Sequence, residues 1–135
     1  MRQSVTPEHI QVEGLYGAEV YSHAIRVGDL LFCSGMSARE PDGAVHAPGD
    51  PGEQARYCFE KLGRALAAAG CSFRDVIKVT TYMVDPEHRA AIAAVRRQHF
   101  SEPLPASTGV VVRQLSDPAL LYEIEAIAVV PSGSR

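Results

Sequence analysis

Apolar residues in the last third of the chain follow strand-like patterns. Residues 109–112 and 121–130 are rich in β-branched and aliphatic side chains, a composition typical of β-strands. Between them, Ser116-Asp117-Pro118 has the chemistry of a turn, because Asp bonds its own backbone and Pro presets φ. The pattern predicts a β-hairpin with a long loop.

Two carboxylates interrupt the second of these strands. Strand alternation places Glu123 and Glu125 on one side, together with Leu121, Ile127 and Val129. A carboxylate on a covered, apolar face must be paired, protonated or in contact with water in a pocket. The alternative is that both glutamates face solvent, and the pattern leaves these two interpretations open.

The first third of the chain also predicts strands. Residues 9–12 alternate like a short edge strand, and residues 20–35 form two strands around Gly28-Asp29, the second of them apolar on both faces. This second strand is expected to end at Ser34-Gly35, where a backbone without Cβ lets a ligand approach closely. An ordinary strand end is the other interpretation. Residues 39–52, rich in Pro and Gly, predict a loop.

Clear start and stop signals predict a first helix. Asp50-Pro51 supplies a cap and a proline at the first helical position, and Gly70 supplies the stop. Apolar residues between them recur at three- and four-residue steps, which predicts an amphipathic helix. Its charged side chains, Lys61 among them, are expected on the surface.

The next elements complete an α+β pattern. Residues 75–84 predict a strand, and Asp85-Pro86-Glu87 repeats the helix-start signal for a helix running to about Phe100. The order β-β-α-β-α-β-β predicts one domain over residues 1–135, with a mixed sheet and two helices packed on one face.

The strands carry more apolar surface than two helices can cover. Residues 30–33, 76–84 and 124–130 present apolar side chains toward both faces of the sheet. We therefore expect a second subunit on the other face, and hence a homo-oligomer. Any pocket at Glu123 would then lie near a subunit boundary.

Composition and charge restrict the partners. The 135 residues are 46% hydrophobic and 21% charged, with a formal net charge of −3 and no Lys/Arg cluster, so neither nucleic acid nor a membrane is expected as a partner. No segment reaches the roughly 18 apolar residues of a membrane span. Three cysteines without C-x-x-C spacing, Cys33, Cys58 and Cys71, favour reduced thiols and a cytoplasmic location.

Common catalytic and metal motifs are missing from the sequence. The five histidines form no H-x-x-x-H or H-E-x-x-H pattern, and none is spaced with a cysteine as in a zinc site. There is also no G-x-G-x-x-G, P-loop or G-x-S-x-G. We predict neither a metal nor a cofactor.

Four segments together resemble the RidA family of reactive intermediate deaminases, also called the YjgF or L-PSP family. They are Y-S-H-A-I-R-V-G-D-L-L-F-C-S-G at residues 21–35, Glu53-Gln54-Ala55, D-V-I-K-V-T at residues 75–80, and Y-E-I-E-A-I-A-V at residues 122–129. The resemblance implies a chorismate-mutase-like fold, a homotrimer, and a small-molecule ligand in each cleft between subunits. It also implies hydrolysis of enamines and imines to ammonia and a keto acid, without metal or cofactor.

The resemblance implies roles for individual residues. Glu123 matches the glutamate that holds the attacking water, Tyr21 the pocket tyrosine, and Ser34-Gly35 the strand-end Ser-Gly that contacts the substrate. These roles make chemical sense, because a carboxylate can deprotonate water, a phenol can bond the leaving nitrogen and exposed backbone can orient the substrate.

The chain departs from the family where active deaminases carry Pro-Ala-Arg-Ser. Here the segment reads Pro105-Ala106-Ser107-Thr108, and Gly109 follows in place of a side chain that is often Cys. Ser107, Thr108 and Gly109 are therefore expected in the substrate-binding set, but without the arginine that clamps a carboxylate. Arg113 lies about 20 Å further along an extended chain and is not expected to replace it.

Two functions from different classes remain open. One is a divergent hydrolase that uses Glu123 and water on a small imine or enamine, with weak activity on 2-imino acids that Ser107→Arg should raise. The other is a trimeric small-molecule-binding protein without chemistry. A ribonuclease is disfavoured by the charge balance and by the lack of a basic aromatic surface.

Overall fold

The computed structural model describes residues 5–132, so Met1–Ser4 of the N-terminal arm lie outside it. The elements are β1 (Glu8–Ile10), β2 (Ala24–Val27), β3 (Leu30–Ser37), α1 (Pro51–Ala68), η1 (Phe73–Asp75), β4 (Val76–Met83), η2 (Pro86–His88), α2 (Arg89–Arg97), β5 (Ala106–Val111) and β6 (Tyr122–Val129), where η marks a 3-10 helix.

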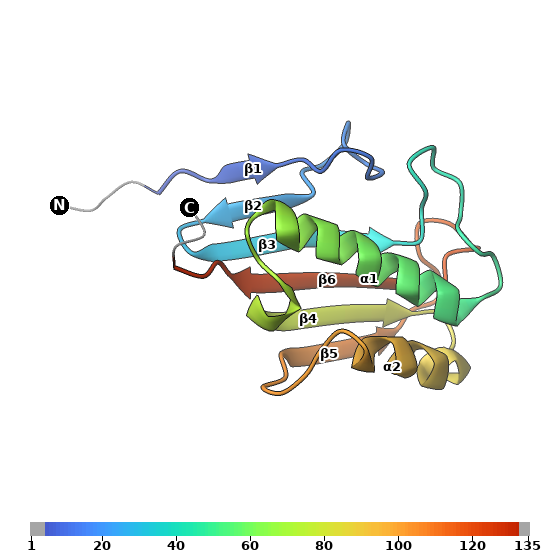
Figure 1. Cartoon of the computed structure of the whole chain (residues 1–135). Helices are drawn as coiled ribbons and strands as arrows, with labels where there is room; N and C mark the ends of the chain where they lie inside the picture. The colour runs from blue at the N-terminus through green and yellow to red at the C-terminus, as the bar shows by residue number, and fades with distance from the viewer. Residues whose placement is uncertain (1–4, 133–135) are drawn as a thin grey trace.

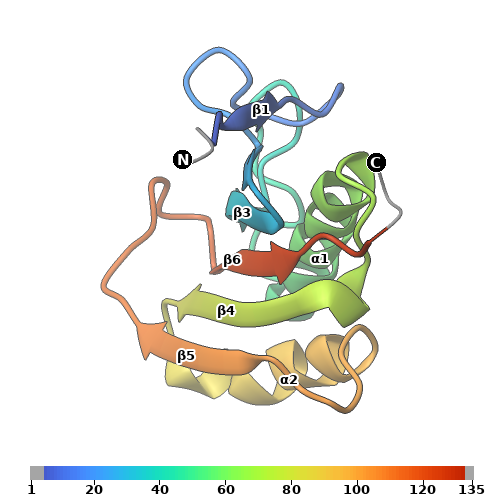
Figure 2. The ribbon, with the colours of Figure 1, turned by 90° about the vertical axis from the view of Figure 1, so that its left-hand side faces the viewer.

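The strands form one mixed sheet in the order β1-β2-β3-β6-β4-β5. Only the β4–β5 pair is parallel, and the other neighbouring strands are antiparallel. Both α-helices lie on the same side of this sheet (Figures 1 and 2). The predicted α+β architecture, a mixed sheet with two helices on one face, is confirmed.

The predicted hairpin between the last two strands is wrong. β6 pairs with β3 and β4, whereas β5 pairs only with β4, so β4 lies between the two strands (Figure 1). β5 is exposed along its whole length, which suits an edge, and the side of β6 that faces the helices is buried. The turn chemistry itself is confirmed, since the Ala119 amide donates to the Asp117 side chain at 2.8 Å.

The first hairpin is confirmed, but its second strand does not end where expected. β2 and β3 pair on either side of Gly28, which takes the φ of +61° that the tight turn requires. β3 then continues past Ser34-Gly35 to Ser37. The Ser-Gly pair is a β-bulge within the strand instead of its end, as described below.

The first helix begins as its signals predict. The Asp50 side chain accepts a hydrogen bond from the Glu53 amide at 3.0 Å, and Gly70 takes a φ of +76° beyond the C-terminus. The second helix is shorter than predicted. After the turn η2, α2 runs only to Arg97, and Phe100 is buried just beyond its end.

The core lies between α1 and the sheet. Phe59, Leu62 and Leu66 of α1 are fully buried and belong to one cluster with Leu31 of β3 and Ile124 of β6. Each such side chain contributes about 1.5–3 kcal/mol through burial, so this contact fixes how the helix lies on the sheet.

The opposite face of the sheet has no helix over it among the described residues. Leu30 and Phe32 on β3 and Val129 on β6 are 38–44% exposed there, and Leu30 lies directly opposite Val129. Apolar side chains on both faces, as the sequence predicts, thus leave one apolar face open. No helix in the range 5–132 is long and apolar enough to cross a membrane.

Candidate functional site

The Glu123 carboxylate lies directly over Gly35. Glu123 on β6 lies directly opposite Ser37 on the neighbouring strand β3. A Cβ atom added to Gly35 would come within 2.7 Å of Glu123 Oε2 and 2.9 Å of its Cδ. Any side chain at position 35 would therefore displace the Glu123 carboxylate.

A β-bulge shapes the strand beneath this carboxylate. Cys33 pairs with Ala126 and Met36 with Ile124, so β3 advances three residues where β6 advances two. The extra residue lies in Ser34-Gly35, and bulges of this kind re-aim side chains near functional sites. Past the bulge, strand alternation puts Ser37 and Arg39 on the same side of the sheet as Gly35.

A cavity of about 470 Å³ opens at this point. Its lining includes four of the predicted site residues, Tyr21, Ser34, Gly35 and Glu123, and also five residues that the sequence analysis missed, Tyr16, Val20, Ser37, Arg39 and Ser116. Continued alternation past Gly35 was the signal for Ser37 and Arg39. A strand that is expected to end at Gly35 hides this signal.

Tyr21 is placed by the loop that precedes β2. Its ring covers Gly17, where an added Cβ would lie 2.2 Å from the ring, and Gly17 has a φ of +97° that favours glycine. The Tyr21 hydroxyl donates to the Tyr16 carbonyl at 3.3 Å. Burial and the nearby Tyr16 and Glu123 raise the Tyr21 pKa, so the phenol stays protonated as a donor.

A buried histidine holds this loop in place. His23 Nδ1 accepts from the Val12 amide at 2.9 Å, and Nε2 faces the Tyr16 carbonyl at 3.0 Å. The first bond makes Nδ1 the acceptor, so Nε2 carries the proton and donates. The same Tyr16 carbonyl receives Tyr21, and His23 thereby positions the tyrosine.

Glu123 is the more available of the two carboxylates in β6. The Glu125 carboxylate accepts from the Tyr82 hydroxyl at 2.5 Å, whereas no described side chain makes a hydrogen bond to the Glu123 carboxylate. Burial, and secondly the charge of Glu125, raise the pKa of Glu123, and Lys61 opposes this shift. Both glutamates are only partly exposed, although the face of the sheet that they share has no helix over it among the described residues.

Lys61 is buried, although the sequence predicts it on the surface. It is 4% exposed, and its Nζ donates to the Ser37 carbonyl at 2.7 Å and the Arg39 carbonyl at 3.1 Å. The aliphatic part of the Lys61 side chain passes along the edge of the core, and its ammonium group donates to these two carbonyl acceptors. Burial lowers the Lys61 pKa. The Lys61 amine therefore links α1 to Ser37 and Arg39, two of the residues that line the cavity.

Gln54 fixes the segment that leads into β6. Its Nε2 donates to the Ala119 carbonyl at 2.9 Å, and its Oε1 accepts from the Leu121 amide at 2.8 Å. Since Gln54 is fully buried, these bonds are costly to lose. The start of α1 therefore fixes the position of Leu121, and with it that of Glu123, which lies two residues after Leu121.

The structure does not bring Ser107, Thr108 and Gly109 together with Glu123 in one chain. They lie on β5, where Ser107 pairs with Val79 and Gly109 with Thr81, and β4 separates them from β6. The Thr108 hydroxyl accepts from Lys78 Nζ at 2.8 Å. A shared pocket would need β5 of a neighbouring copy, and this remains a prediction.

The described residues contain neither a reactive, exposed thiol nor a cluster of metal-ligating side chains. Cys33, Cys58 and Cys71 are unpaired and buried, and burial raises the pKa of the Cys33 and Cys58 thiols to about 12. Within residues 5–132 no three His, Cys, Asp or Glu side chains cluster as metal ligands. The chemistry available to the cavity is thus that of a half-buried carboxylate, a phenol, hydroxyls and one guanidinium.

The chain matches known proteins over most of its length. Residues 13–130 match the family model described as Endoribonuclease L-PSP. The RutC family protein YjgH of Escherichia coli K12 is 42% identical over 119 residues, which cover 87% of this chain and 88% of the relative. The 2-iminobutanoate/2-iminopropanoate deaminase of Mus musculus is 33% identical over 109 residues, covering 81% and 80%.

A solved structure agrees with these sequence matches. The RidA protein from an Antarctic Psychrobacter species has a TM-score of 0.82 at 30% identity, and the match covers 91% of this chain and 99% of that one. A family model over residues 13–130 and relatives of similar length show the family directly. The chain therefore belongs to the RidA family, also called the L-PSP family, and has its chorismate-mutase-like fold.

Proposed function

We propose that this protein hydrolyses the C=N bond of a small, activated imine or enamine, with Glu123 as the general base. The observation that carries the proposal is the Glu123 carboxylate, which is half-buried, has a raised pKa and lies without a hydrogen-bond partner over Gly35 in a cavity. A base of this kind is suited to work near neutral pH. Relatives named as 2-iminobutanoate/2-iminopropanoate deaminases support the reaction class.

The reaction needs only water. Glu123 accepts a proton from the water as the water oxygen forms a bond to the imine carbon. The C=N π pair becomes a lone pair on nitrogen, which takes that proton from the Glu123 carboxyl. The resulting tetrahedral aminoalcohol then forms a C=O bond and breaks its C–N bond, while Glu123 transfers the hydroxyl proton to nitrogen, which leaves as ammonia. The net change is imine plus water to ketone plus ammonia.

Tyr21 and the bulge have supporting roles in the proposal. The Tyr21 hydroxyl would donate a hydrogen bond to the leaving nitrogen, once it exchanges the long 3.3 Å bond to the Tyr16 carbonyl for the substrate. Ser34 already donates to the Ser22 carbonyl at 2.6 Å, so its oxygen is left to accept. No metal or cofactor enters any step.

We also propose that the protein is a homotrimer in which β5 of one subunit completes the cavity of the next. The open apolar face with Leu30, Phe32 and Val129 supports assembly, and the exposed Ser107–Gly109 segment supports its participation in a shared cleft. Light scattering should give about three times the 14.5 kDa chain mass. A monomer mass in dilute solution would remove the shared cleft.

The second candidate is a binding protein of the same fold that lacks catalysis, and the absence of the family arginine at Ser107 is the observation that favours it. A ribonuclease is not proposed, because the net charge of −3 gives no electrostatic attraction for RNA.

Ammonia release separates the two candidates. An amino-acid oxidase generates 2-iminobutanoate in situ, and the rate of ammonia release is compared with and without the protein. We expect acceleration over the spontaneous reaction, and its loss in Glu123→Gln. Equal rates with and without the protein, for carboxylated and neutral imines alike, would instead support the binding protein.

A further inference from the structure

We propose that Arg39 binds the carboxylate of the ligand and so takes the role that Ser107 cannot fill. This inference rests on the proposed function, because it assigns a substrate class, 2-imino and 2-oxo acids, to the cavity that contains Glu123. Arg39 is the one Lys or Arg among the described residues that line this cavity. Its guanidinium offers the planar pair of N–H donors that matches a carboxylate.

The geometry leaves Arg39 with donors to spare. Of its five N–H groups, one on Nη1 donates to the Gly43 carbonyl at 2.9 Å. The nearest carboxylate in the described chain is Asp117, which forms a long ion pair with Arg39 at 3.9 Å between Oδ2 and Nη2, too far for a hydrogen bond. The side chain is only 17% exposed, so an incoming carboxylate would form its bonds largely away from water, where they are stronger.

Arg39 is held in place before a ligand arrives. Its guanidinium lies 5.3 Å from the centre of the Tyr16 ring, and its own carbonyl accepts from the buried Lys61. It also bridges to Val45 as an isolated β-pair. A preorganised arginine loses little side-chain freedom on binding, which increases the affinity for the ligand.

The loop that follows Arg39 is braced against α1. The two ring nitrogens of His46 face Glu40 at 3.1 Å and Glu53 at 2.7 Å, and its ring stacks on Tyr57 at 4.2 Å. Both partners accept hydrogen bonds when ionised, so the arrangement favours a doubly protonated imidazole. The hydrogen bond to Glu53 is the largest cause of the raised His46 pKa.

The charge pattern of the cavity gives the ligand a direction. A carboxylate next to Glu123 would be repelled, whereas the same group next to Arg39 is attracted. The imine carbon, which must meet the water held by Glu123, is thus directed away from the guanidinium end. Lys78, a cation close to Thr108, already donates to the Thr108 hydroxyl and to the Val79 carbonyl and does not line this cavity.

Binding of a product-like keto acid tests the inference without turnover. 2-Oxobutanoate and the neutral 2-butanone are titrated into wild type, Arg39→Gln and Arg39→Lys, with affinities from ligand-observed NMR. Arg39→Gln should weaken 2-oxobutanoate about 10- to 100-fold and leave 2-butanone unchanged. Arg39→Lys should fall between the two, because it keeps the charge but loses the fork.

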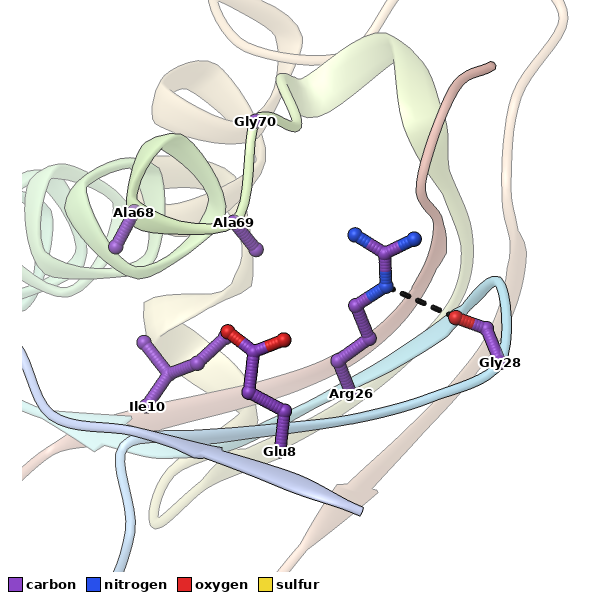
Figure 3. Close-up of a pocket in the computed structure, with 7 residues that line it drawn as sticks. All are labelled: Glu8, Ile10, Arg26, Gly28, Ala68, Ala69 and Gly70. Carbon is purple, nitrogen blue, oxygen red and sulfur yellow. Dashed lines mark hydrogen bonds between the residues drawn. The ribbon is translucent and has the colours of Figure 1, made fainter. Parts of the chain in front are cut away.

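Arg26 provides a matched control. Its side chain is 15% exposed, its Nε donates to the Gly28 carbonyl at 2.9 Å, and its Nη2 lies 3.6 Å from Asp29. It lines a separate cavity, shown in Figure 3. Arg26→Gln should leave the binding of both compounds unchanged, and melting temperatures show whether each variant is folded.

Several outcomes would overturn the inference. They are equal 2-oxobutanoate affinity in Arg39→Gln and wild type, no binding by wild type at millimolar ligand, or a loss found in Lys78→Gln instead. The hydrolase proposal fails separately. If wild type accelerates no imine hydrolysis but Arg39→Gln alone loses keto-acid binding, the role of Arg39 stands and the catalytic function does not.

Discussion

Two of the cavities in the described part of the chain contain one arginine each in nearly the same setting, but only one of the two also contains a partly buried carboxylate. The Arg26 cavity, at the C-terminal end of α1 (Figure 3), is the larger at about 570 Å³ against about 470 Å³. Arg26 and Arg39 are 15% and 17% exposed, and each donates to a glycine carbonyl at 2.9 Å. Neither the volume of a cavity nor a buried arginine in it is therefore enough to identify a functional site.

The carboxylates make the difference. Glu8 in the Arg26 cavity is exposed and lies directly opposite Arg26 across β1 and β2, as in an ordinary surface pair. Glu123 is partly buried, lies over Gly35 and has a raised pKa. The comparison favours the Glu123 cavity as the candidate site, because its carboxylate is partly buried beside a bulge that makes room for it.

Glu123→Gln should have the largest effect. Removing a general base costs about 10²- to 10⁴-fold in rate, and the amide keeps the size of the side chain, so the assembly should stay intact. Glu125→Gln is the matched control on the same strand face, and we expect it to lose less than about tenfold. Equal losses in both variants would show that the comparison between the carboxylates is wrong. Full turnover in Glu123→Gln would make that carboxylate structural.

Gly35→Ala should come next. Its new Cβ would overlap the Glu123 carboxylate at 2.7 Å, and a displacement of about 1 Å can cost about 100-fold in kcat. Gly52→Ala, whose added Cβ would meet only Ala91 and Asp50 at 3.7–3.8 Å, should leave kcat unchanged. Steady-state kinetics on both variants check this. An active Gly35→Ala would mean that the carboxylate has no fixed position.

Ser107→Arg should raise activity on 2-imino acids, as the sequence predicts, but by less than about tenfold while Arg39 is present. In an Arg39→Gln background the gain should be larger, because the new guanidinium then restores a missing clamp. The double variant is compared with each single variant by kcat/KM. A Ser107→Arg effect that is the same in both backgrounds would show that the two positions serve different ligands.

The smallest effect concerns pH. Glu123 must be deprotonated to act as a base, so kcat/KM should fall as pH drops through its raised pKa. Glu125→Gln removes one cause of that shift and should move this acid limb to lower pH. The raised pKa also costs stability, and this cost grows as pH rises from the ordinary value of 4.5 through the folded-state pKa.

Glu123→Gln should therefore be more stable than wild type at neutral pH and lose that advantage in acid. Thermal melts at several pH values measure it. A stability difference that does not change with pH would show that the Glu123 pKa is unperturbed by folding.

The sequence predicts local structure well because local rules determine it. Alternation gave the strands, Asp50-Pro51 gave the start of α1, and Gly28 gave the first turn, each of them a matter of neighbouring residues. The order of the strands depends on contacts far apart in the chain. The hairpin prediction failed for that reason, since β4 enters between β5 and β6.

The site was predicted in part for the same reason. Glu123, Tyr21 and Ser34-Gly35 were found through a charged residue in an apolar strand and through motifs that resemble a family. Arg39 and Lys61 were missed because their positions depend on a bulge and on the packing of α1 against β3, which a loop composition and a helix period do not reveal. A buried lysine that binds two carbonyls cannot be recognised from its spacing.

The most direct test of the central claim is a crystal structure of the protein soaked with 2-oxobutanoate. We predict the keto acid in the Glu123 cavity, with its carboxylate on the Arg39 guanidinium and its carbonyl carbon turned toward the Glu123 carboxylate and a water. Occupancy of the Arg26 cavity instead, or a keto acid in the predicted cavity with its carboxylate turned away from Arg39, would contradict the account.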